Sequence, residues 1–126
     1  MGTPMPVCIK RAYEQPGARD GIRILVDGLW PRGVSKADLK ISAWEKSIAP
    51  SKALRVWYGH DPVKWPEFRS RYRDELEEPP RREVLDRLIA IAGQSTLTLV
   101  FAARDADHSN AAVIAEAIQS RLMGGH

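Results

Sequence analysis

The sequence predicts an α/β fold in which helices cover both faces of a small, mainly parallel sheet. The first observation is that strand-like apolar runs alternate along the chain with amphipathic helical stretches, as in sheets built from parallel strands. The second is size, because 126 residues with 44% apolar side chains are enough for one hydrophobic core. We therefore expect a single α/β domain over residues 1–126.

Three apolar runs predict strands of this sheet. VCIKRAY (7–13) has the pattern of a first strand, IRILVD (22–27) is typical of a buried strand, and STLTLVFAA (95–103) is the clearest strand in the chain. The turn-rich stretch QPGARDG connects the first two. AWEKSIAP (43–50) is ambiguous between strand and loop, and we interpret it as a strand.

Capping residues and apolar spacing predict the helices. Ser35 and Ser51 occupy N-cap positions of two short helices, and Asp61, which precedes a proline, starts a third helical segment. Pro79 ends the third helix and Gly93 ends the next one. The longer helices carry apolar stripes made of Trp65, Phe68, Tyr72 and Leu76, of Leu85, Leu88, Ile89 and Ala92, and of Ala111, Ile114, Ala115, Ile118 and Leu122.

Charge, cysteine content and hydropathy narrow the function classes. Nineteen Lys and Arg against sixteen Asp and Glu give a net charge of +3, too small an excess to indicate nucleic-acid binding by itself. No apolar run reaches membrane-spanning length and the N-terminus lacks the apolar centre of a secretory signal, so we expect a cytoplasmic protein with no membrane partner. Cys8 lies between Val7 and Ile9, and we expect its thiol to be buried filler.

Two polar loops follow the best strands and predict a site. DGLWPRG (27–33) follows IRILV, and RDADHSN (104–110) follows LTLVFAA. Ligands of open parallel sheets lie at the carboxyl ends of the strands, so the two loops share one edge if their strands are parallel neighbours. Glycine lets such a loop turn, arginine offers a fork of donors and tryptophan a flat surface. The side chains expected at this edge are Asp27, Trp30, Arg32, Arg104, Asp105, Asp107 and His108.

Several of these residues have structural alternatives. Asp27 is able to accept hydrogen bonds from its own turn, and Trp30 is able to cover the core. Asp105 and Asp107 precede a helix, where short acidic side chains are common caps, although together with His108 they also offer ligands for a divalent cation. The sequence contains no P-loop, G-x-G-x-x-G, H-E-x-x-H or G-x-S-x-G motif, so no motif specifies a cofactor or a metal site.

The ordered motifs DGLWPRGVSK, APSKALRVWYGHDPVKWPEFRSRYRDEL and TLTLVFAARDADHSNAAV resemble the YeaO-like family of small bacterial proteins, within domain of unknown function 488. The resemblance runs from about Val7 to about Leu122 and implies a compact α/β fold without an established activity. Family members more often have arginine at the position of Gly28, and often a second histidine at Ala111 or Ala112. The motif positions carried over are Asp27, Trp30, Pro31, Arg32, Gly33, Pro50, Ser51, Arg55, Trp57, His60, Tyr72, Arg104, Asp105, His108 and Asn110.

Two hypotheses of function follow. In the first, the cleft binds an anionic small molecule or nucleotide and is suited to hydrolysis or group transfer by acid–base chemistry. Its catalytic candidates are Asp27, His60, Asp105 and His108, and its binding candidates are Trp30, Arg32, Arg55, Trp57, Tyr72, Arg104 and Asn110. The alternative is a non-catalytic nucleic-acid or protein binding module whose basic surface consists of Arg69, Arg71, Arg73, Arg81 and Arg82.

The loop 27–33 also yields two orientation predictions. We expect the Trp30 indole to pack on apolar neighbours, because a large ring gains most from burial. We expect Arg32 to point toward the cleft and to pair with a carboxylate or a bound anion, because Pro31 and Gly33 restrict the turn that carries it.

Overall fold

The computed structural model describes residues 7–124 and contains a four-stranded, all-parallel sheet in the order β1-β4-β2-β3. The strands are β1 (Val7–Arg11), β2 (Ile22–Leu25), β3 (Ala43–Trp44) and β4 (Leu97–Phe101). β4 lies between β1 and β2 and all five of its residues are buried, as expected for an interior parallel strand. The predicted α/β class is therefore confirmed.

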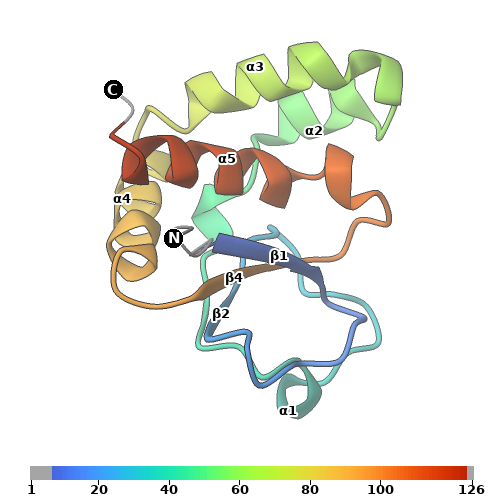
Figure 1. Ribbon diagram of the computed structural model, residues 1–126. Helices are drawn as coiled ribbons and strands as arrows, with labels where there is room; N and C mark the ends of the chain where they lie inside the picture. Colours follow the sequence, from blue (N-terminus) through green and yellow to red (C-terminus); the bar gives the residue numbers. More distant parts are fainter. Residues whose placement is uncertain (1–6, 125–126) are drawn as a thin grey trace.

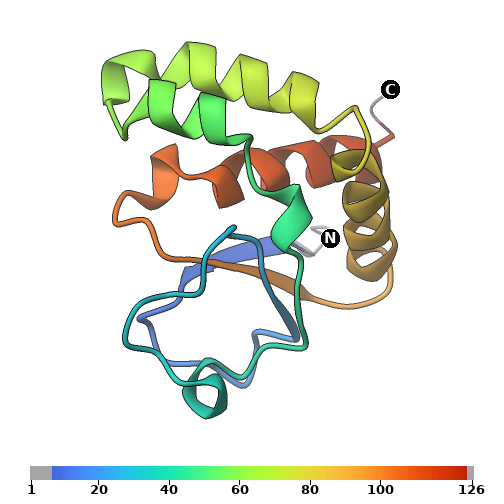
Figure 2. The ribbon, with the colours of Figure 1, turned by 180° about the vertical axis from the view of Figure 1, so that it is seen from behind.

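The two faces of the sheet are covered unequally (Figures 1 and 2). The larger helices lie together on one face, where β4 residues Leu97, Leu99 and Phe101 enter the main core. These helices are α2 (Lys52–Tyr58), α3 (Trp65–Glu75), α4 (Arg81–Ala92) and α5 (Asn110–Leu122). On the opposite face, within residues 7–124, the short helix α1 (Lys36–Leu39) and its flanking loops form a second, smaller core around Leu25 and Val100.

The predicted caps and stripes form as expected. Ser35 and Ser51 accept hydrogen bonds from the backbone N–H groups of Asp38 and Leu54, and Asp61 caps the 3₁₀ turn η2 (Pro62–Lys64) that leads into α3. Buried members of the three apolar stripes include Phe68, Tyr72, Leu76, Leu85, Leu88, Ala92, Ala111, Ile114 and Ile118. Local sequence therefore predicts where the helices begin and which faces they bury.

One local prediction held only in part and another was wrong. The segment 43–50 contains only the two-residue strand β3, followed by the 3₁₀ turn η1 (Lys46–Ile48), because its Ile48 turns into the main core. Cys8 is exposed, not buried, because its strand β1 lies at the edge of the sheet and its side chain alternates away from the core that Val7 enters.

No helix among residues 7–124 has the length and apolar character needed to cross a membrane.

Candidate functional site

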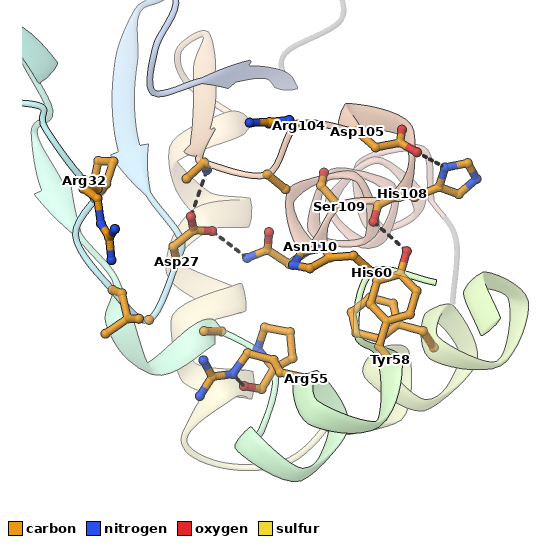
Figure 3. A pocket seen from close by; sticks show the side chains of 18 of the residues that line it. Asp27, Arg32, Arg55, Tyr58, His60, Arg104, Asp105, His108, Ser109 and Asn110 are labelled. Carbon is orange, nitrogen blue, oxygen red and sulfur yellow. Dashed lines mark hydrogen bonds and ion pairs between the residues drawn. The ribbon is translucent and has the colours of Figure 1, made fainter. Parts of the chain in front are cut away.

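A cavity of about 760 Å³ opens at the carboxyl ends of β2 and β4, which are parallel neighbours. Asp27 and Arg104 follow these strands and both line the cavity, so the prediction that they share one edge of the sheet is confirmed. The volume falls within the range of about 300–1,000 Å³ typical of small-molecule sites. Figure 3 shows how side chains from separate loops and helices converge there.

Most of the predicted site residues are brought together. The cavity lining includes Asp27, Trp30, Arg32, Arg55, His60, Arg104, Asp105, His108 and Asn110. Trp57 and Tyr72 lie outside it. The Trp57 ring is covered by the cationic groups of Lys64 and Arg71, and Tyr72 is fully buried with its hydroxyl donating to the Ile48 carbonyl at 2.5 Å.

Asp27 joins three elements at the floor of the cavity. Its Oδ2 accepts from the Ala102 backbone N–H at 2.9 Å, beyond β4, and its Oδ1 accepts from the Asn110 amide at 3.1 Å, at the start of α5. The same amide donates to the Val26 carbonyl at 3.2 Å. Burial raises the pKa of the Asp27 carboxyl, against the lowering effect of these two donors and of the charges on Arg55 and His60. Both carboxylate oxygens are thus already engaged within the protein.

The three cavity arginines are differently placed. In the part of the chain that the structure describes, the guanidinium groups of Arg32 and Arg104 have no hydrogen-bond or ion-pair partner. Arg55 donates through Nε to the Pro50 carbonyl at 3.2 Å, and its other two nitrogens have no partner among these residues. The expected carboxylate partner of Arg32 is therefore absent from residues 7–124, and pairing with an external anion stays a prediction.

Trp30 and Arg32 differ as predicted in their surroundings. The Trp30 indole packs with the smaller core, meets Trp44 edge-on at 5.5 Å between ring centroids, and donates to the Val34 carbonyl at 2.6 Å. Arg32 is exposed at the cavity, and the Tyr13 hydroxyl donates to its backbone carbonyl at 3.1 Å. One short loop thus anchors its indole and presents its guanidinium.

Asp105 and His108 form a pair at another side of the cavity. The His108 Nδ1 lies 2.6 Å from an Asp105 carboxylate oxygen, and the imidazole meets the Trp65 ring edge-on at 5.1 Å. The hydrogen bond from His108 holds the pKa of the Asp105 carboxyl below its usual value. Asp107 does not join them in a cation site, because no group of three or more His, Cys, Asp or Glu side chains within residues 7–124 is arranged to hold a metal ion.

Sequence reasoning missed two tyrosines of the cavity. Tyr58 is buried, stacks on Phe68 at 4.2 Å and donates through its hydroxyl to the His108 carbonyl at 3.0 Å. Tyr13, on the loop after β1, lies beside Arg32. Helical spacing could have found Tyr58, because it lies three residues after Arg55 on α2 and so shares a face with it. Tyr13 was not predictable in this way, because it reaches the site through a contact with the separate loop 27–33.

Side chains of α3 and α4 hold the segment that precedes α2. Glu75 accepts from both the backbone N–H and the hydroxyl of Ser51, at 2.9 and 2.6 Å. Arg81 donates to the Ala49 carbonyl at 2.7 Å. With the Tyr72 bond to Ile48, these contacts position the start of the helix that carries Arg55.

The arginines of the predicted basic surface are all paired with carboxylates, unlike those of the cavity. Both Arg69 and Arg73 bond to Glu116 of α5. The other pairs join Arg71 to Glu67, Arg81 to Glu75, and Arg82 to Glu77 and Asp86. Their charge is largely neutralised by neighbouring acids.

Comparison with known proteins identifies the relatives of this chain. Residues 6–125 match the family described as "Inactive DUF488-N3 subclade". The chain belongs to the DUF488 family. It is 38% identical over 116 residues to the uncharacterized protein YeaO of Escherichia coli, covering 92% of this chain and 99% of the relative. It is 42% identical over 115 residues to the uncharacterized protein Rv3073c of Mycobacterium tuberculosis, covering 91% and 95%.

These relatives confirm the YeaO-like resemblance read from the three motifs. No solved structure matches the chain. The departure at Gly28 lies in the cavity of this DUF488 protein, where an added Cβ would meet the Ala49 Cβ at 3.6 Å, an ordinary contact distance. The cavity therefore has room for at least a Cβ atom at this position.

Proposed function

We propose that this DUF488 protein binds an anionic small molecule or nucleotide in the cavity, with Arg32, Arg55 and Arg104 holding the anion. The observation that carries the proposal is the absence of carboxylate partners for these arginines within residues 7–124, although every arginine of α3 and α4 has one. Guanidinium groups form strong, often bidentate hydrogen bonds with phosphate and carboxylate oxygens. An external anion would supply the acceptors that the protein does not.

Binding without catalysis fits the floor of the cavity. Both carboxylate oxygens of Asp27 accept hydrogen bonds, one from the Ala102 N–H and one from the Asn110 amide. The carboxylate therefore links the ends of β2 and β4 to the start of α5. The matching family is itself described as inactive. Both observations favour a ligand-binding role over general-base chemistry at Asp27.

Acid–base catalysis is the second candidate, and the Asp105–His108 pair is the observation that favours it. A carboxylate that orients an imidazole through Nδ1 is the arrangement used by many general bases. Under this alternative His108→Gln abolishes turnover of a bound anionic ester while its binding persists. Nucleic-acid binding is disfavoured, because Arg69, Arg71, Arg73, Arg81 and Arg82 lie beside carboxylates that would repel phosphates.

The test is calorimetric titration with ribose 5-phosphate at low salt, with ribose as the uncharged counterpart. We expect saturable binding of the phosphate only, and Arg104→Gln to weaken it at least about tenfold, since a charge-assisted hydrogen bond contributes roughly 1.5–3 kcal/mol. Arg82→Gln, on the helical surface, is the matched control and should change the affinity less than twofold. Equal effects of the two substitutions, or no phosphate binding, would contradict the proposal.

A further inference from the structure

We infer that the ligand carries, besides its anionic group, a planar ring that lies against His60 on the aromatic side of the cavity. This inference rests on the proposed function and narrows its ligand class to nucleotide-like anions. It is carried by three features of the cavity: its size, the division of its lining and the backbone of His60.

The cavity is far larger than an inorganic anion requires. Its volume of about 760 Å³ compares with about 30 Å³ for one water molecule in the liquid, so a phosphate group held by the arginines fills only a small part. The remaining space must accommodate another chemical group if the ligand is to exclude water from the site.

The arginines line one side of the cavity, together with Trp30 and Tyr13 beside Arg32, and Tyr58 and His60 form a second aromatic side away from them. In Figure 3, Arg32, Arg55 and Arg104 lie around Asp27, whereas Tyr58 and His60 lie beyond Asn110. Tyr58 continues the aromatic side into the core through its stacking on Phe68. A ligand that matches both sides has a charged end and a flat, weakly polar end.

His60 itself is held in an unfavourable backbone conformation. Its φ of 57° follows a Gly59 φ of 54°, and the Asp61 N–H closes this turn by donating to the Tyr58 carbonyl at 3.0 Å. Left-handed geometry costs free energy for a residue with a Cβ atom, and glycine would adopt it without that cost. Strain of this kind is common where a side chain serves a ligand.

The imidazole that this strained turn presents is available for contact. It is tilted by 49° from the Tyr58 ring at 6.0 Å, and it lines the cavity. Among the described residues neither of its nitrogens has a hydrogen-bond partner. A planar ring placed here gains a stacking surface and a hydrogen-bonding edge at once.

The experiment compares ribose 5-phosphate with AMP and UMP, which add a purine or a pyrimidine to the same sugar phosphate. We expect at least one nucleotide to bind about tenfold or more tightly than ribose 5-phosphate, since one stacked base contributes roughly 1–3 kcal/mol. In His60→Gly this ratio should fall below about threefold. The urea midpoint of His60→Gly should equal or exceed that of the parent, because glycine relieves the strained φ.

Lys40→Gly is the matched control. Lys40 is the other residue with a Cβ atom and positive φ in the described chain, at 52°, and it ends α1 on the opposite face of the sheet. This substitution should leave the nucleotide preference unchanged.

The outcomes separate this inference from the proposed function. In one outcome, the nucleotides bind no tighter than ribose 5-phosphate while binding still depends on Arg104. That result would not contradict the proposed anion site, but it would contradict the inference that the ligand carries a ring. A nucleotide preference that survives His60→Gly would also overturn it. Failure of all three probes to bind would contradict the proposed function itself.

Discussion

The arginines on the surface of α3 and α4 and the arginines at the cavity differ in whether a carboxylate pairs with them. On α3, Arg69 and Arg73 share Glu116 as their ion-pair partner. Arg71 of α3 pairs with Glu67, and Arg82 of α4 pairs with Glu77. At the cavity, Arg32 and Arg104 form no ion pair among residues 7–124. The difference shows that neighbouring acids neutralise the surface set, whereas no ion pair within the described residues neutralises the cavity set.

Asp27 sharpens this contrast, because it is a carboxylate of the cavity that does not neutralise the arginines by direct pairing. Its oxygens accept from a backbone N–H and from the Asn110 amide. The cavity therefore keeps its guanidinium donors available while its own acid is occupied with joining strands and helix.

The largest effect is expected at Trp30, which shares a loop with Arg32. Trp30→Ala should lower the free energy of unfolding by about 3–5 kcal/mol, because it removes an indole packed on Trp44 and the smaller core. Arg32→Ala should change it by less than about 0.5 kcal/mol, as is usual for an exposed side chain. Urea unfolding measures both. A Trp30→Ala protein as stable as the parent would make the indole part of the ligand site.

Asp27→Ala should produce the next largest effect. It leaves the Ala102 N–H and the Asn110 amide without their acceptor, at a cost of about 2–4 kcal/mol for two part-buried donors. Urea unfolding at neutral pH provides the measurement. A loss below about 1 kcal/mol would mean that Asp27 is not structural, and would restore it as a catalytic candidate.

The pH dependence of the free energy of unfolding provides a second test of the structural role of Asp27. Because burial raises its pKa in the folded protein, the native state holds the proton more tightly than the unfolded chain does. Its contribution to stability is therefore complete below the ordinary carboxyl pKa and declines as the pH rises through the raised value. Asp27→Asn, which does not titrate there, should lack this decline. Parallel curves for parent and variant would contradict the assignment.

The smallest effect is expected from separating surface arginines from their acid. Glu116→Gln removes the shared partner of Arg69 and Arg73, and because these groups are partly exposed it should cost only about 0.5–1 kcal/mol in urea unfolding. It should not change the affinity for ribose 5-phosphate. A variant that gains a second phosphate site of similar affinity would show that an unpaired arginine is enough for binding. The cavity would then not be needed to explain anion binding.

The sequence predicted most of the helices and strands and the edge at which the cavity forms. Ser35, Ser51 and the proline and glycine signals mark helix ends by local chemistry, and Asp27 and Arg104 were placed together because parallel neighbouring strands end at one edge. These inferences need only local pattern and a general rule of sheet topology.

Contacts between residues far apart in the sequence could not be predicted from local patterns. Glu116 lies 47 positions from Arg69, and nothing in either local pattern indicates that they meet. Trp57 and Tyr72 belong to the same motif as Arg55, but Trp57 packs under Lys64 and Arg71 and Tyr72 is buried in the main core. The sequence therefore predicted a group of candidate site residues, and the packing of the helices determines which of them line the cavity.

Urea unfolding in rising inorganic phosphate, with chloride at matched ionic strength as reference, tests the central claim most directly. An anion that binds only the folded state raises the free energy of unfolding with its concentration, by about 2.7 kcal/mol at one hundred times its Kd. We predict this rise for the parent and for a variant with Arg69, Arg71 and Arg82 replaced by glutamine. It should vanish when Arg32, Arg55 and Arg104 are replaced instead. Equal phosphate stabilisation of both triple variants would contradict the account.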